Sequence, residues 1–247
     1  WIASLLLIFN VILANLAPIL ILPLFYKSKP LGDEYKELID RLMNLAKLSG
    51  TRIRGIYQFD MSKRTRAANA ALVGLGNTRR IILGDTLISE FNHDEIETVC
   101  AHELGHHVHK DIPLAILVQG TMTLVGLYLT SLCLRSGIKV LGIENISDVA
   151  TMPLLFLVFG TYGLITMPLS NAYSRWRERL ADQYALSITG KPHAYASALI
   201  RLANQNLAEI EPEPWVEFIF YSHPSLGKRI AMAQANWFNQ DKKVDAT

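Results

Sequence analysis

Two imidazoles and a carboxylate lie close together in the segment His102-Glu103-Leu104-Gly105-His106, which matches the pattern H-E-x-x-H. Four residues advance an α-helix by about one turn, so His102 and His106 leave the same helix face and can bind one metal ion. Glu103 lies beside that face and could take a proton from a metal-held water as a general base. The pattern predicts a catalytic site with Zn²⁺ as cofactor, one ion per chain. Two histidines on a solvated helix face are the plain alternative.

A catalytic zinc ion takes three protein ligands and leaves a fourth position for water, so a third ligand is needed. His109 follows on the same helix, but it lies too far along the axis to close a compact site with His102. Glu178 is the better candidate, because it follows the last long apolar stretch of the chain. Asp182 lies one turn further on and could accept the second ring N–H of a ligating histidine. By pattern alone, a solvated charged helix is an equal alternative for this segment.

The composition and the apolar stretches indicate a membrane protein. Half of the 247 residues are hydrophobic and 19% are charged, whereas soluble domains carry about 25% charged residues. Residues 1–26, 112–134 and 149–174 contain no charged side chain. Each stretch can cross a bilayer as a helix, which needs about 20 apolar residues. Three such stretches in one short chain disfavour the alternative, buried helices of a soluble core. We therefore predict transmembrane helices at these positions and the lipid bilayer as a partner.

The distribution of positive charge predicts the orientation. The block 27–111 holds 13 Lys and Arg and the tail 175–247 holds nine, whereas the loop 135–148 holds two. The positive-inside rule therefore places the two rich blocks in the cytoplasm and the short loop outside. The net charge of +2, without a basic run, gives no indication of nucleic acid as a partner. We expect a multi-pass protein of the bacterial inner membrane or the endoplasmic reticulum, with its site on the cytoplasmic side.

The polar blocks contain signals for short strands and amphipathic helices. Asn92, with Glu95 three residues later, is typical of a helix N-cap, and that helix should reach the second apolar stretch near Pro113. Gly190 and Pro192 should end the helix that continues from the third stretch. Further helices are predicted at 35–48, 192–210 and 224–238, and strands at 53–59, 70–73 and 80–83. The predicted fold class is mainly α, with transmembrane helices and a catalytic domain that contains a small β-sheet.

Several separated motifs follow one another along nearly the whole chain. They are Leu24–Leu31, Asp60–Thr65 with Asn69-Ala70, Arg80–Leu87, the H-E-x-x-H segment, Glu178 with Ala181-Asp182, and His223-Pro224 with Arg229. In these motifs the sequence resembles the integral-membrane gluzincins, the family that includes CAAX prenyl protease 1 and the heat-shock protease HtpX. It looks closer to CAAX prenyl protease 1. The resemblance implies a gluzincin-type metalloendopeptidase domain.

The resemblance also implies roles for the matching residues. The zinc ligands would be His102, His106 and Glu178, and Glu103 would activate water. Asp182 would orient a ligand.

On the substrate side, the resemblance implies that His223 stabilises the oxyanion and that Arg229 supports the site. Asn69 and Ala70 would lie on an edge strand that pairs with the substrate backbone, as extended peptides do when they add to a sheet. Without the resemblance, His223 is only a histidine beside a proline at a helix start.

The substrate stays open at this stage. The main hypothesis is an endopeptidase that cleaves membrane-associated proteins. The alternatives are a true CAAX prenyl endopeptidase and a catalytically silent membrane scaffold. The prenyl proteases have more spans than the three visible here, and the loop 136–147 is short. Because the chain begins at Trp1 within an apolar stretch, we expect further sequence upstream. The sequence predicts no oligomeric state.

Overall fold

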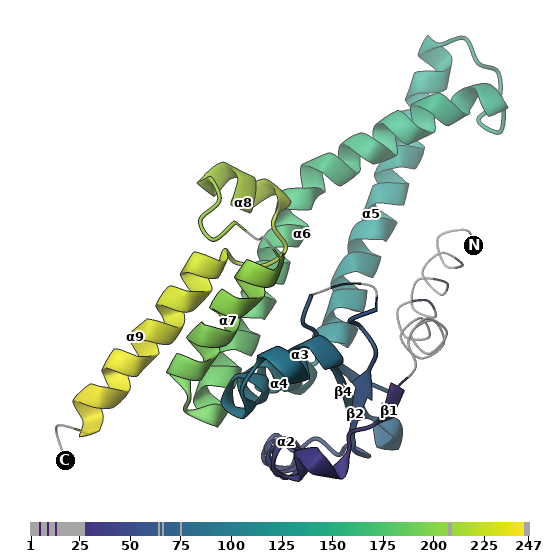
Figure 1. Ribbon diagram of the computed structural model, residues 1–247. Helices are drawn as coiled ribbons and strands as arrows, with labels where there is room; N and C mark the ends of the chain where they lie inside the picture. Colours follow the sequence, from purple (N-terminus) through teal and green to yellow (C-terminus); the bar gives the residue numbers. More distant parts are fainter. Residues whose placement is uncertain are drawn as a thin grey trace.

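The chain forms a small mixed sheet and a set of helices around the helix that carries the H-E-x-x-H segment (Figure 1). The computed structural model describes residues 28–63, 65, 67–74, 76–206 and 209–244, together with Leu5, Phe9 and Leu13. The predicted membrane helix at 1–26 lies outside the described residues, apart from those three positions. In chain order the elements are β1 (Ser28–Pro30), η1 (Asp33–Tyr35), α2 (Lys36–Leu48), β2 (Ile56–Phe59), β3 (Ala70–Val73), η2 (Gly76–Thr78), β4 (Arg80–Gly84), α3 (Asp85–Glu90), α4 (His93–Val108), α5 (Asp111–Val140), η3 (Val149–Thr151), α6 (Met152–Thr189), α7 (Pro192–Asn206), α8 (Pro214–Phe220) and α9 (Leu226–Val244).

Helix α4 begins at the predicted capping box. The Asn92 side chain accepts a hydrogen bond from the Glu95 backbone N–H, and the Glu95 carboxylate accepts one from the Asn92 N–H, both at 2.9 Å. The Glu95 carboxylate also accepts hydrogen bonds from Ser197 and Arg201 of α7, and Glu95 is fully buried. The start of this helix is therefore fixed by local and tertiary contacts together.

The end of α4 differs from the prediction that this helix reaches Pro113. It ends at Val108, and Lys110 adopts a left-handed conformation with φ 55° before α5 begins at Asp111. Pro113 lies in the first turn of α5, where its missing N–H removes no helical hydrogen bond. The proline is therefore compatible with a new helix start, and the chain changes direction directly after the H-E-x-x-H turn.

The sheet has the strand order β1-β2-β4-β3. Strands β2 and β4 are parallel, and the two outer pairs are antiparallel. Strands β3 and β4 occur where predicted, β2 begins three residues later than expected, and β1 was not predicted. Leu83 of β4 is fully buried beneath α2 and α4, together with Leu38, Leu42 and Leu104. This core holds the sheet against the helix that carries the two histidines.

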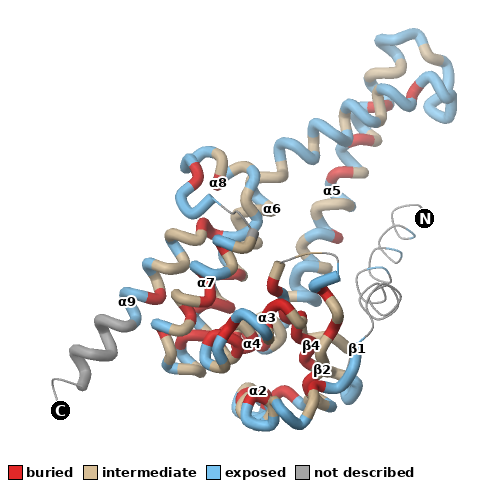
Figure 2. Tube along the Cα trace, viewed as in Figure 1, coloured by how far each residue is buried: buried red, intermediate tan, exposed pale blue. Residues whose placement is uncertain are grey.

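Helices α5 and α6 form a hairpin that projects from the rest of the molecule and exposes most of its surface (Figure 2). Among the described residues, these are the two helices long and apolar enough to cross a membrane, by length and composition alone. Helix α5 continues to Val140, so Arg135 and Lys139 lie on its last turns and not in the predicted loop 135–148. Both long side chains suit a helix end near water.

Helix α6 continues without interruption from its apolar part into the polar region and ends at Thr189. Gly190 follows in the left-handed conformation, φ 63°, as predicted for a helix end. The single helix therefore carries Glu178 and Asp182 on an extension of the apolar stretch. Helix α6 packs extensively on α4, and α4 also contacts α7. The short helix α8 was not predicted.

Candidate metal centre

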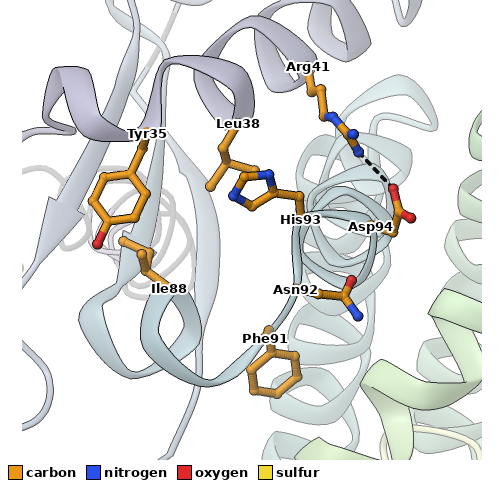
Figure 3. A pocket seen from close by; sticks show the side chains of 8 residues that line it. All are labelled: Tyr35, Leu38, Arg41, Ile88, Phe91, Asn92, His93 and Asp94. Atoms are coloured by element: carbon orange, nitrogen blue, oxygen red, sulfur yellow. Dashed lines mark hydrogen bonds and ion pairs between the residues drawn. The ribbon is translucent and has the colours of Figure 1, made fainter.

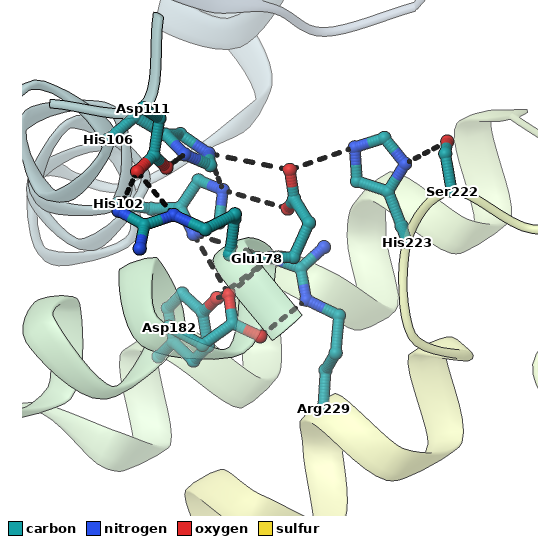
Figure 4. Close-up of polar contacts among 10 residues, drawn as sticks. His102, His106, Asp111, Glu178, Asp182, Ser222, His223 and Arg229 are labelled. Carbon is teal, nitrogen blue, oxygen red and sulfur yellow. Dashed lines mark hydrogen bonds and ion pairs between the residues drawn. The ribbon is translucent and has the colours of Figure 1, made fainter. Parts of the chain in front are cut away.

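Three side chains from two helices converge on one point (Figure 4). His102 Nε2 and His106 Nε2, both on α4, are 3.1 Å apart. Glu178, on α6, places Oε2 3.4 Å from His102 Nε2 and Oε1 3.5 Å from His106 Nε2. The structure thus brings together the three ligands expected from the sequence, as a group that could hold a metal ion.

A carboxylate lies behind each of the two imidazoles. His102 Nδ1 is 2.8 Å from Asp182 Oδ1, and His106 Nδ1 is 2.6 Å from Asp111 Oδ2. These contacts place the ring proton of each neutral histidine on Nδ1, so both Nε2 atoms carry lone pairs directed at the same point. Two lone pairs 3.1 Å apart repel each other unless a positive charge lies between them.

The donor set fits a zinc ion. Tetrahedral ligands at about 2.0–2.1 Å from zinc are separated by about 3.3 Å, close to the 3.1, 3.4 and 3.5 Å observed here. The Glu178 Oε2 atom is buried without a hydrogen-bond partner. A buried carboxylate oxygen in that state is costly in a protein without an ion. Two imidazoles and one carboxylate also match the ligands of catalytic zinc sites.

The local field favours positive charge. Burial acts to lower the pKa of His102, but its contacts with Asp182 and Glu178 outweigh burial and raise that pKa to about 9. The same carboxylates would stabilise a metal cation at the Nε2 atom, and binding it would release the proton. Burial raises the pKa of Glu103, which lines the same cavity.

Asp182 is the centre of a second network. It is fully buried and accepts hydrogen bonds from Arg229, whose Nε is 2.9 Å from Oδ2 and whose guanidinium nitrogen is 2.6 Å from Oδ1. The Tyr195 hydroxyl donates to Asp182 and accepts from Arg229 at 2.9 Å. This network ties α9 and α7 to the histidine on α4, which gives Asp182 and Arg229 the geometry of supporting residues.

His223 approaches from the loop between α8 and α9. Its Nε2 is 3.3 Å from Glu178 Oε1, its Nδ1 is 3.0 Å from the Ser222 hydroxyl, and 59% of its side chain is exposed. It therefore lies at the open side of the ligand cluster.

A cavity of about 250 Å³ joins the parts of the site. Its wall includes the three ligands, Glu103, His223 and Arg229, and also Asn69 and Ala70. Ala70 belongs to β3, which is an edge strand of the sheet, and Asn69 directly precedes it. Apolar residues of α3, α4 and α7 complete the wall. All the site residues predicted from the sequence thus lie around one cavity or directly behind it.

The sequence reasoning missed Asp111, Arg177 and Tyr195. The Arg177 Nε donates to Asp111 Oδ1 at 2.7 Å, and a guanidinium nitrogen donates to the His109 carbonyl at 2.8 Å. His109 itself lies outside the ligand cluster, with its ring against Tyr184. The one available signal for Asp111 was its position five residues after His106, at the start of an apolar stretch.

Another cavity, of about 420 Å³, lies between α2 and the beginning of α4 (Figure 3). Arg41 and Asp94 form an ion pair of 2.7 Å at its edge, and Tyr35, Phe91 and His93 are among the residues that line it. None of the described ligand-cluster residues lines this cavity. The three candidate metal ligands line the cavity at the H-E-x-x-H helix instead.

Comparisons with known proteins show the family of the chain. The model of peptidase family M48 matches residues 32–236. The chain is 31% identical over 230 residues to an uncharacterized metalloprotease, YhfN, of Bacillus subtilis, covering 92% of this chain and 54% of that protein. It is 30% identical over 226 residues to a probable CAAX prenyl protease 1 of Schizosaccharomyces pombe, covering 90% and 47%. The crystal structure of S. mikatae Ste24p matches with a TM-score of 0.81 and 28% identity, over 94% of this chain and 57% of that one.

The helical fold with its small sheet places the H-E-x-x-H helix beside a carboxylate-bearing helix, an arrangement that could hold one metal ion. The match over most of its length shows that the chain belongs to peptidase family M48. The resemblance inferred from the sequence motifs is confirmed. The chain spans about half the length of the curated relatives described above.

Proposed function

We propose that this chain carries the active site of a zinc-dependent endopeptidase that is embedded in a membrane and cleaves membrane-associated proteins near the cytoplasmic face. The observation that carries the proposal is the triangle of His102 Nε2, His106 Nε2 and a Glu178 oxygen. Asp182 and Asp111 orient both imidazoles toward its centre. Such supporting carboxylates are typical of built metal sites and are unnecessary for histidines on a solvated face.

His102, His106 and Glu178 would hold the zinc ion. When bound, zinc polarises a peptide carbonyl and makes water more acidic. Glu103, next to His102 on α4, would take the proton of the attacking water and pass it to the leaving amine. Its burial raises its pKa, which suits a group that must both accept and release a proton near neutral pH.

Two further groups would act on the peptide. His223 lies at the open side of the cluster and would donate a hydrogen bond to the oxyanion that develops during attack. The free edge of β3 at Asn69 and Ala70 would pair with the substrate backbone. Arg229 would keep Asp182 in place behind His102.

The membrane placement rests on the α5–α6 hairpin. Only 11% of the residues in the apolar window of α5 and 6% of those in α6 are buried, and apolar residues exposed in this way are unfavourable in water and normal in lipid. Glu178 follows the end of the charge-free stretch, at Ser174, by four residues. The catalytic residues would therefore lie close to the bilayer surface, on the side of the Lys- and Arg-rich blocks.

A second candidate is cleavage of prenylated C-terminal tails. It is favoured by the similarity to proteins named CAAX prenyl protease 1. The two candidates share the same active site and differ in the substrate that the cavity admits.

The test uses Glu103→Gln, which keeps the size of the side chain but removes the base. The variant should retain one zinc ion per chain and lose cleavage of both a farnesylated CAAX peptide and a membrane-protein substrate. Glu34→Gln, the same change at an exposed position of η1, should leave cleavage unchanged. Normal cleavage by Glu103→Gln would refute the mechanism. The wild-type rates on the two substrates decide between the two candidates.

A further inference from the structure

Helix α8 presents large aromatic side chains outward. Trp215, Phe218 and Phe220 are 62%, 55% and 58% exposed on this seven-residue helix. Trp215 and Phe218 are three residues apart and therefore share one helix face. Each such side chain would bury about 150–250 Å² in an apolar environment. Exposure of three of them on one short element indicates a surface that binds something.

Helix α8 is fixed on α6 through the carbonyl groups near its C-terminal end. The Asn171 side chain donates to the Ile219 carbonyl at 2.5 Å, and Arg175 donates to the Glu217 carbonyl at 3.0 Å and the Tyr221 carbonyl at 2.6 Å. The Arg175 guanidinium also lies 6.0 Å from the centre of the Phe218 ring.

The buried Glu217 side chain completes this attachment. It pairs with Lys228 at 2.8 Å and accepts a hydrogen bond from the Ser225 N–H at 3.3 Å, both in the chain that leads into α9. The polar groups of α8 are therefore paired with α6 and with the chain that leads into α9, whereas Trp215, Phe218 and Phe220 stay more than half exposed.

The position of α8 along α6 identifies what the rings would meet. Figure 1 shows α8 beside α6, at the root of the α5–α6 hairpin. Its anchors Asn171 and Arg175 lie on either side of Ser174, where the charge-free stretch of α6 ends. Residues 171–175 rise by about 6 Å along the helix, comparable to the headgroup layer on one side of a bilayer, about 5–8 Å.

Two more exposed side chains near Ser174 are of types that occur at membrane interfaces. Trp176 is 51% exposed, on the turn of α6 that binds α8. Arg179 is exposed one turn after Arg175. Tryptophan rings concentrate at the boundary between acyl chains and headgroups, and arginine binds lipid phosphate.

We propose that α8 and Trp176 together form an interfacial anchor, in which the rings of Trp215, Phe218, Phe220 and Trp176 insert into the headgroup layer and Arg179 binds lipid phosphate. The inference rests on the proposed placement of α5 and α6 in the membrane. In this proposal the exposed aromatic side chains of α8 contact lipid and not another protein. Because Ser222 and His223 directly follow α8, the anchor would also fix the height of the His223 loop above the bilayer.

The test measures tryptophan fluorescence in vesicles of phosphatidylcholine, with and without lipids brominated near the headgroup end of the acyl chain. The chain has four tryptophans. Replacing Trp1, Trp176 and Trp237 by Phe leaves Trp215 as the single reporter. Its emission should be blue-shifted relative to a water-exposed tryptophan and should be strongly quenched by the brominated lipid, with little quenching by aqueous iodide.

Two matched controls in the tryptophan-free background calibrate the result. Leu157→Trp, on the exposed apolar part of α6, should be quenched by brominated lipid. Leu48→Trp, equally exposed at the end of α2, should be quenched by iodide alone. If the triple replacement impairs folding, the difference between the wild type and Trp215→Phe gives the same readout.

The outcomes separate the two proposals. Suppose that Leu157→Trp is quenched by brominated lipid, whereas Trp215 is quenched only by iodide or by neither agent. Then α8 faces water or protein, so the anchor is refuted and the membrane placement stands. If Leu157→Trp is not quenched by lipid, the membrane placement fails and the anchor fails with it. Lipid quenching of both positions supports both.

Discussion

Replacing Asp111 by Asn tests whether the carboxylate behind His106 builds the metal site. Asp111 Oδ2 accepts from His106 Nδ1 at 2.6 Å, and Asp111 Oδ1 accepts from Arg177 Nε at 2.7 Å. The side chains of Asp111 and Arg177 are about nine-tenths buried. Both partners are donors. An asparagine amide has one oxygen and one NH₂ group, so whichever way it turns, one donor meets another donor.

The expected loss can be estimated from this geometry. Removing such a supporting partner lowers metal affinity by about 10- to 100-fold, equivalent to about 1.4–2.8 kcal/mol. Leaving Arg177 without its carboxylate also lowers the free energy of unfolding, by on the order of 3 kcal/mol. The arginine keeps its bond to the His109 carbonyl, so we expect the fold to persist.

The assay is a competition for zinc between the purified protein and a fluorescent chelator. The control is Asp40→Asn, the same chemical change on the exposed face of α2. The control should bind zinc as the wild type does, whereas Asp111→Asn should show a dissociation constant raised by about 10-fold or more. A folded Asp111→Asn variant with wild-type zinc affinity would refute the claim that Asp111 positions His106.

Three further predictions follow from the packing and the polar network. Gly105→Ala would place a Cβ 3.1 Å from the Ala181 Cα and 3.2 Å from its carbonyl oxygen, forcing α4 away from α6. We expect a free energy of unfolding lower by about 1–3 kcal/mol and weaker zinc binding. The control is Gly160→Ala, whose added Cβ meets nothing within 4 Å. If Gly105→Ala has the same melting temperature and zinc affinity as Gly160→Ala, close packing of α4 on α6 does not determine the geometry of the metal site. Tyr195→Phe removes the hydroxyl shared by Asp182 and Arg229 and should reduce the free energy of unfolding by about 1–3 kcal/mol; an unchanged thermal midpoint would contradict this. A chelator such as EDTA should abolish cleavage and added zinc should restore it, whereas activity that persists after removal of the metal would contradict a metallopeptidase.

The parts of the site that the sequence could predict are those set by local spacing. The i, i+4 relation of His102 and His106, and the capping box at Asn92, each depend on one helix, and the structure has both. Glu178 required more, because its approach to α4 depends on the packing of two helices. The family motifs provided that information, and the short-range pattern did not.

The residues that were missed act across tertiary contacts. Asp111 reads as the polar end of a membrane helix, and its role depends on the left-handed Lys110, which turns α5 so that the carboxylate faces back to His106. Arg177 reads as one more charge on a basic helix. Helix α8 has seven residues, too few for a periodic pattern, and its position depends on hydrogen bonds from α6.

The central claim is that His102, His106 and Glu178 hold one catalytic zinc ion, and the zinc content of the purified protein tests it most directly. We predict one zinc ion per chain in the wild type and in Glu103→Gln, with an X-ray absorption spectrum showing two imidazole nitrogens at about 2.0–2.1 Å and oxygen as the remaining neighbour. His102→Ala and Glu178→Ala should each lose most of the bound zinc. Equal zinc content in these variants and in the wild type would contradict the account.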